Sequence, residues 1–217
     1  MSFYQSLLER TSSERDYLLS APIIAQAMAG KVSLASYVAF LTEAYHHVKH
    51  TVPLLMACGA RLPERLEWLR EAIAEYIDEE KGHQEWVLND LAACGADKEA
   101  VRQGTPKLPT ELMVSYVYDS IARHNPVSFF GMVNVLEGTS IALATQVAGV
   151  IQDQLQLPNK AFSYLSSHGS LDLEHIEFFK KLMNQLDNPD DKAAVLHTAK
   201  VVYQLYGDMF RSLPLSA

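Results

Sequence analysis

Apolar residues recur at helical spacing along almost the whole chain. An apolar residue at every third or fourth position is typical of amphipathic helices that bury one face. Two pairs, Asn125-Pro126 and Asn188-Pro189, have the form of a helix cap followed by a first-turn proline. Pro53 lies inside a helical stretch, where its missing N–H should kink or end the helix. The predicted helices span residues 3–19, 22–29, 34–58, 64–93, 109–123, 126–154, 159–179 and 190–211.

No segment alternates apolar and polar residues as a half-buried β-strand does, so the pattern predicts an all-α fold. The sequence has no Ser/Gly-rich linker, no block of like charges and no repeat of solenoid period, which favours one domain over residues 1–217. We therefore expect a single helical bundle, with four long helices at its centre and shorter helices around them.

The composition narrows the class of protein. Hydrophobic residues make up 48% of the chain and charged residues 20%, as in globular proteins. The net charge of −8 and the lack of a basic run argue against nucleic acid as a partner. Two cysteines, Cys58 and Cys94, are too few for a disulfide framework or a cysteine-ligated zinc site. The N-terminus lacks a signal-peptide pattern and no stretch approaches ~18 uninterrupted apolar residues, so we expect a cytoplasmic protein with no membrane partner.

Ionisable residues lie on the faces that a bundle should bury. Glu80 and His83 fall on the apolar face of the 64–93 helix, three residues apart. Glu137 lies in the 126–154 helix, with Val133 and Ile141 one turn to either side. An isolated buried carboxylate costs several kcal/mol unless it is compensated, so these positions need a partner of opposite charge.

Two further helices carry similar residues. His168, Asp172 and His175 share one helical face, and Glu43 lies on an inward face with His47 one turn later. Each acid-x-x-His pair follows an inward acid by a similar interval, the length of a two-helix hairpin. Taken singly, each feature also has an ordinary interpretation, such as a chance spacing, an exposed helical pair or a surface turn.

The joint pattern predicts a metal centre. Di-iron proteins built on bundles take one carboxylate from each of two helices and an acid-x-x-His pair from each of two others. Carboxylate oxygen with imidazole suits iron, with manganese as the alternative. The predicted ligands are Glu43, Glu80, His83, Glu137, His168, Asp172 and His175. Further candidates, as ligands or as their neighbours, are His47, Glu79 and Tyr76.

The segment His168-x3-Asp172-x2-His175, preceded by Glu137 and by His83, resembles the haem-oxygenase-like di-iron oxidases and oxygenases. Their helical fold is shared with haem oxygenase, the thiaminase II proteins and pyrroloquinoline-quinone synthase. The resemblance implies a non-haem di-iron enzyme that activates O₂ to oxidise a small organic substrate. We expect a homodimer.

The resemblance leaves some ligands open. Several family members have a Glu where this chain has Tyr76, and others have it three residues before the histidine, which corresponds to Glu80. The neighbouring Glu79 is the alternative to Glu80. The ligand from the 34–58 helix is Glu43, His46 or His47.

Two other classes of function stay open. A ferritin-like iron-binding protein could use the same ligands, although it needs neither His168 nor the short outer helices. A metal-free, thiaminase II-like binding protein would merely hydrogen-bond the same groups. Haem oxygenase needs a proximal histidine on its first helix, and no histidine precedes His46. Thiaminase II proteins use a cysteine of the central helix, and residues 129–151 contain none.

Overall fold

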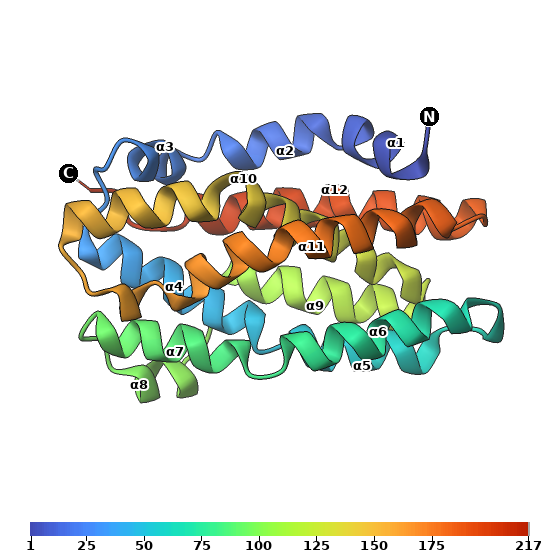
Figure 1. Cartoon of the computed structure of the whole chain (residues 1–217), viewed down its shortest axis with the longest axis horizontal. Helices are drawn as coiled ribbons and strands as arrows, with labels where there is room; N and C mark the ends of the chain where they lie inside the picture. Colours follow the sequence, from blue (N-terminus) through green and yellow to red (C-terminus); the bar gives the residue numbers. More distant parts are fainter. Residues whose placement is uncertain (217) are drawn as a thin grey trace.

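A computed structural model describes the backbone of residues 1–216 and their side chains, except those of residues 145 and 167–174. Within that part of the chain every regular element is a helix, which confirms the predicted all-α fold (Figure 1). Short 3₁₀ turns cover Glu64–Leu66, Pro126–Ser128 and Asn159–Ala161. The α-helices are α1 (Phe3–Arg10), α2 (Ser12–Leu19), α3 (Pro22–Met28), α4 (Leu34–Val48), α5 (Thr51–Arg61), α6 (Glu67–Glu80), α7 (His83–Ala93), α8 (Lys98–Gln103), α9 (Leu108–Arg123), α10 (Phe129–Leu155), α11 (Ser163–Gln185) and α12 (Pro189–Arg211).

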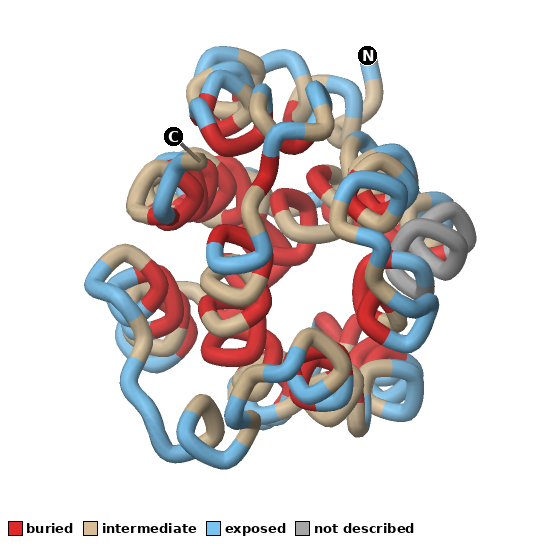
Figure 2. Tube along the Cα trace, turned by 90° about the vertical axis from the view of Figure 1, so that its left-hand side faces the viewer, coloured by how far each residue is buried: buried red, intermediate tan, exposed pale blue. Residues whose placement is uncertain are grey.

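The three long helices α10, α11 and α12 form one layer of the bundle. α10 packs along both α11 and α12, while α9 packs against α12 (Figure 1). α4 contacts α7, and α5 contacts α6, so these four helices form a second layer. α1, α2 and α3 run along the outer side of the long helices (Figure 1). Viewed end on, the buried residues face the interior of a ring of helices (Figure 2).

Several helix ends follow the sequence pattern. The Asn125 side chain accepts a hydrogen bond from the N–H of Val127, and Asn188 accepts one from Asp190. The predicted 34–58 helix is broken between α4 and α5, which leaves Pro53 in the first turn of α5, where a missing N–H costs little.

Two helices predicted as continuous are wrong in their continuity. The 3–19 segment divides into α1 and α2 at Thr11. The 64–93 segment divides into α6 and α7 at Lys81-Gly82. Gly82 has φ 95°, a left-handed conformation that glycine adopts without a steric penalty. The short helix α8 was absent from the prediction, because its apolar pattern is too short to detect. The 3₁₀ turns form the first residues of three segments predicted as α-helical.

The segment Pro126–Ala144 is long and apolar enough to cross a membrane by length and composition. Its most apolar window is 56% buried inside the bundle, as the core helix of a globular fold would be. The apolar character of this segment is therefore accounted for by packing against α11 and α12.

Candidate metal centre

Glu80 and His83 meet across the break between α6 and α7. The distance from Glu80 Oε2 to His83 Nδ1 is 3.0 Å, and both side chains are largely buried. The His83 ring stacks on Trp86, with 4.0 Å between ring centroids. The predicted pairing is therefore present, although the turn at Gly82, rather than a continuous helix, brings the two groups together.

His175 of α11 lies between two carboxylates. Its Nε2 is 3.0 Å from Glu79 Oε2, and its Nδ1 is 4.0 Å from Glu137 Oε1. His175 is only 7% exposed. Carboxylates from α6 and α10 thus converge on the imidazole of α11. Glu79, which the sequence left as the alternative to Glu80, contacts this imidazole directly.

A cavity adjoins these groups, and its space between atoms, open solvent included, is about 700 Å³. Its polar lining includes Glu80, Glu137 and His47, which come from α6, α10 and α4. Aliphatic and aromatic side chains from α5 and α10 form much of the remaining wall. None of the described residues that line it is Lys or Arg. We call this space the acidic cavity.

Tyr76 lines the acidic cavity and is only 2% exposed. Its hydroxyl makes no hydrogen bond to any described residue. The ring lies edge-on to His175, at 6.1 Å between centroids, and packs against Phe178. Burial raises the pKa of the Tyr76 phenol, and the nearby carboxylate of Glu137 raises it further. Tyr76 is therefore a neutral hydroxyl that can donate a hydrogen bond to a molecule in the cavity.

Glu43 does not share this cavity, which corrects the expectation that its carboxylate points into the site. The Glu43 carboxylate accepts a hydrogen bond from the Lys107 N–H at 3.1 Å and another from the Thr110 hydroxyl at 2.6 Å. These donors belong to the start of α9, where unpaired N–H groups and the helix dipole favour an anion. His47, one turn further along α4, faces the acidic cavity instead.

His46, the third option on α4, has a different environment. Its Nδ1 lies 3.2 Å from Lys49 Nζ, and burial together with Lys49 lowers the pKa of His46 to about 4. His46 is not among the residues that line the acidic cavity. Of the three candidates on this helix, the geometry favours His47.

Two predicted ligands, His168 and Asp172, lie outside the described side chains. Among the side chains that the structure does describe, no group of three or more His, Cys, Asp or Glu is placed to hold a metal ion. The described donors come as the pair Glu80–His83 and as His175 with its two carboxylates.

The two cysteines do not have the environment of a reactive thiol. The buried Cys58 thiol donates to the carbonyl of Pro126, and burial raises its pKa to about 12. Burial also raises the pKa of Cys94 to about 11, with a contribution from Asp90. A nucleophilic cysteine needs a lowered pKa, so neither thiol has the chemistry of a thiaminase nucleophile.

Sequence reasoning missed Tyr164 and Tyr206, which line the acidic cavity from α11 and α12. Both belong to ordinary apolar stripes, so no signal in the sequence separates them from core residues.

Comparison with solved structures identifies the fold. A domain of unknown function with a heme oxygenase-like fold from Shewanella denitrificans has a TM-score of 0.84 and 24% identity, covering 95% of this chain and 90% of that one. A TenA homologue from Pseudomonas syringae pv. tomato has a TM-score of 0.79 and 14% identity, covering 96% and 90%. Heme oxygenase from Leptospira interrogans has a TM-score of 0.78 and 19% identity, covering 98% and 100%.

No curated protein matches the chain. A family model described as "Iron-containing redox enzyme" matches residues 38–207. This range includes the acidic cavity and every predicted ligand. The chain is thus a haem oxygenase-like helical bundle, and it belongs to the family of iron-containing redox enzymes.

Proposed function

We propose that the protein is a non-haem di-iron oxidase that uses O₂ to oxidise a small organic substrate. The observation that carries the proposal is the convergence of carboxylate and imidazole groups from α4, α6, α7, α10 and α11 beside one cavity. Oxygen and nitrogen donors of this kind suit iron, and manganese is the closest alternative.

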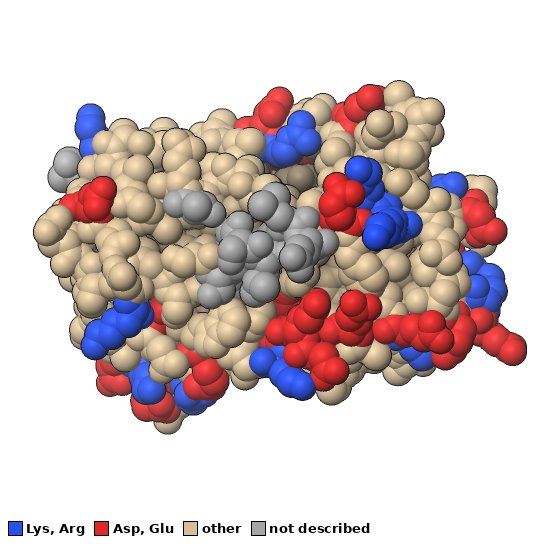
Figure 3. All heavy atoms as spheres, viewed as in Figure 1, with Lys and Arg blue, Asp and Glu red and all other residues tan. Residues whose placement is uncertain are grey.

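The charge of the site fits a cation. Glu80 and Glu137 line a cavity whose described walls contain no Lys or Arg. Outside it, exposed acidic side chains gather over α6, including Glu71, Glu75 and Asp78 (Figure 3). Part of this surface charge is neutralised, since Lys81 pairs with Asp78 and Arg70 pairs with Glu67. The acidic lining of the cavity itself is therefore the feature that favours a cation.

The chain offers ligands for two ions. Glu80, His83 and Glu137 would hold one iron, and His175 would hold the other together with His168 and Asp172. Iron bound in this way would supply the redox chemistry with O₂. A complete set needs donors beyond the described side chains, which gives His168 and Asp172 a specific role.

The remaining residues prepare the space around the ligands. Glu79 fixes the orientation of the His175 ring through its contact with Nε2. Leu55, Phe129 and Met132 contribute apolar wall that excludes water from the reacting centre. The Tyr76 hydroxyl is placed to donate a hydrogen bond to a substrate oxygen.

The alternatives fit the residues less well. A haem group would need an axial histidine on the first helices, and α1, α2 and α3 contain none. A thiaminase-like reaction would need an activated thiol, which neither cysteine provides. We propose a homodimer rather than the large cage of an iron store, a distinction that gel filtration makes directly.

Metal analysis tests the proposal. The metal-free protein is loaded with Fe(II) without oxygen, and bound iron is measured for wild type, Glu137→Gln and the control His197→Ala, an exposed histidine of α12. Wild type and the control should bind two iron ions per chain and consume O₂ after mixing with air. Glu137→Gln should lose bound iron. A wild type that binds neither Fe(II) nor Mn(II) would show that the proposal is wrong.

A further inference from the structure

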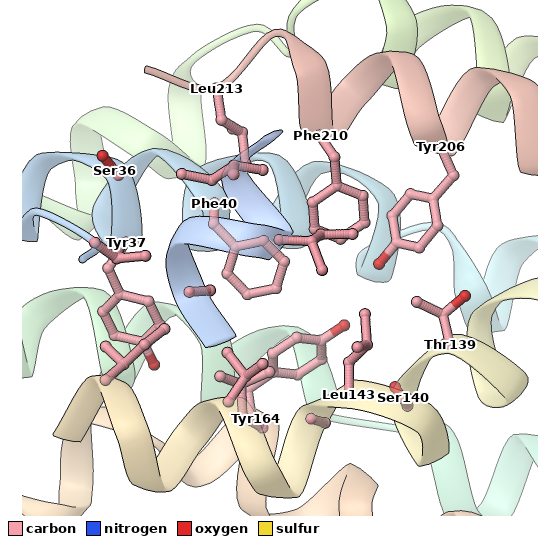
Figure 4. Close-up of a pocket in the computed structure, with 18 residues that line it drawn as sticks. Ser36, Tyr37, Phe40, Thr139, Ser140, Leu143, Tyr164, Tyr206, Phe210 and Leu213 are labelled. Atoms are coloured by element: carbon pink, nitrogen blue, oxygen red, sulfur yellow. The ribbon is translucent and has the colours of Figure 1, made fainter. Parts of the chain in front are cut away.

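A second cavity lies beside the acidic cavity and has a different chemistry. Its space between atoms, open solvent included, is about 690 Å³. Its lining comes from α3, α4, α10, α11 and α12 and is mainly aliphatic and aromatic (Figure 4). The polar groups among its described lining residues are hydroxyls, and none of these residues is charged. We call this space the apolar chamber.

The apolar chamber adjoins the candidate metal centre. Ser140, Tyr164 and Tyr206 line both the chamber and the acidic cavity. Ser140 also lies in α10 within one turn of Glu137, one of the proposed ligands. In Figure 4 the hydroxyl-bearing side chains of Tyr206, Thr139 and Ser140 lie toward one end of the chamber, and Tyr37 lies toward the opposite end. Ser36 also lies at that opposite end, but the hydroxyls there are bonded within the protein: Tyr37 donates to the carbonyl of Ala161, and the Ser36 hydroxyl is 2.7 Å from that of Ser33. The end with Ser140 and Tyr206 is the one that the chamber shares with the acidic cavity.

The C-terminal tail contributes to the wall of the chamber. Leu213, just after α12, contributes to the wall. The tail is fixed by Ser216, whose N–H donates to the Gln26 side chain and whose carbonyl accepts from it. The Ser216 hydroxyl also accepts a 2.7 Å hydrogen bond from the N–H of Ser33. Specific hydrogen bonds thus hold the tail in place beside the chamber.

We propose that the apolar chamber binds the uncharged, apolar part of an amphipathic substrate, whose polar end reaches the metal centre past Ser140, Tyr164 and Tyr206. The inference rests on the proposed function, because the metal centre defines which end reacts. A charged group inside the chamber would lose its hydration without gaining a partner of opposite charge. An apolar chain has no such penalty and gains from leaving water. The division between the two cavities therefore selects a molecule with one polar end.

Binding to the metal-free protein tests the chamber separately from the iron chemistry. The probes are straight-chain alcohols from 1-hexanol to 1-decanol, titrated by calorimetry. Affinity should rise roughly fourfold for each added methylene, the factor expected for burying that group. If no alcohol binds saturably, or if affinity does not rise with chain length, the proposal is overturned.

Substitutions locate the binding. Ala144 is buried and lines the chamber, so Ala144→Phe should fill it and weaken 1-decanol binding about tenfold or more. Ala142→Phe is the matched control, because Ala142 is exposed two residues away on the same helix. Leu143→Lys is a second variant, which places a charge at a partly exposed lining position with less disturbance of packing. Melting curves check that all three are folded. Equal binding by wild type, Ala144→Phe and Leu143→Lys would place the alcohol elsewhere.

The head group of the probe tests the orientation. Glu80 and Glu137 lie at the polar end, so metal-free protein should bind decanoate more weakly than 1-decanol. Equal affinities would contradict the proposed placement of the polar end.

The two proposals fail in different ways. His175→Ala should bind 1-decanol like wild type even though it loses iron. If iron binds and the alcohols do not, the chamber proposal is wrong and the metal centre stands. If the alcohols bind and iron does not, the proposed oxidase is wrong, while the chamber remains a site for an apolar ligand.

Discussion

Two sets of buried carboxylates occur in this bundle, and their partners differ. Glu43 and Asp90 bind the beginnings of helices that lie far away in the sequence, and their oxygens accept from backbone N–H and hydroxyl groups. Glu80 and Glu137 contact imidazoles and line a cavity. An acid on an inward helical face is therefore insufficient to identify a metal ligand. The chemical type of its partner separates an anion that stabilises a helix from one that is available to a cation.

The largest effect on stability is expected at Asp90. This side chain is fully buried and accepts from the N–H groups of Ser163 and Tyr164 at the start of α11, and from the Ser163 hydroxyl. Asp90→Ala leaves these donors without an acceptor, so unfolding in urea should show a loss of about 3 kcal/mol. Asp90→Asn, which keeps one acceptor oxygen, should lose less. A change below about 0.5 kcal/mol for Asp90→Ala would refute the structural role.

Substitution of Glu43 tests directly whether it is a structural carboxylate or a metal ligand. Glu43→Ala should reduce the free energy of unfolding by about 2 kcal/mol, because the N–H of Lys107 and the hydroxyl of Thr110 lose their acceptor. Iron bound per folded chain should stay at the wild-type value, since the carboxylate faces α9 rather than the cavity. If Glu43→Ala instead loses iron with little loss of stability, Glu43 is a metal ligand.

Asp191 is another buried carboxylate with a structural role, and it should make the stability of the fold depend on pH. Burial raises the pKa of Asp191, but hydrogen bonds from Arg65 and Asn125 lower it by more. The pKa of Asp191 therefore lies below its ordinary value. A carboxyl with a lowered pKa in the folded state stabilises the protein above its unfolded pKa near 3.8, and this contribution disappears as the pH falls through the folded value. Asp191→Asn should therefore unfold with less dependence on pH below about 4. Parallel acid titrations of the two proteins, followed by circular dichroism, measure the difference.

Gly82 gives the smallest expected change in stability. Its positive φ disfavours any other residue, while an added Cβ would meet no atom within 4 Å, so Gly82→Ala should cost about 1 kcal/mol from the backbone alone. Gly149→Ala is the control, because Gly149 lies within α10 with equally open space and no positive φ. That control should be neutral or slightly stabilising. If both substitutions stabilise, the turn that joins Glu80 to His83 does not require glycine.

The sequence predicts the helices well because their signals are local. Asn125 and Asn188 cap the turns that follow them, and Pro53 lies at the beginning of α5 as its missing N–H requires. The break at Gly82 was missed because glycine is tolerated in a helix, and its positive φ is a property of the folded chain.

The candidate site was only partly predictable, since its contacts join distant segments. The sequence predicted that Glu80 and His83 lie together, although the turn at Gly82 rather than helical spacing makes the contact, and helical spacing placed Glu137 on an inward face. It could not show that Glu43 meets the start of α9, because that depends on how α4 packs against a helix 64 residues later in the chain. The contact between Glu79 and His175 likewise depends on the packing of α6 against α11.

Iron stoichiometry of His175→Ala, measured beside its melting temperature, tests the central claim most directly. The controls are wild type and His197→Ala. We predict that His175→Ala loses at least one of two iron ions per chain, while the metal-free variant melts within a few degrees of metal-free wild type, roughly the shift expected for less than 1 kcal/mol. His197→Ala should match wild type in both measurements. Unchanged iron content with a clearly lowered melting temperature would mean that His175 is a packing residue held by Glu79, and would contradict the assignment of the metal centre.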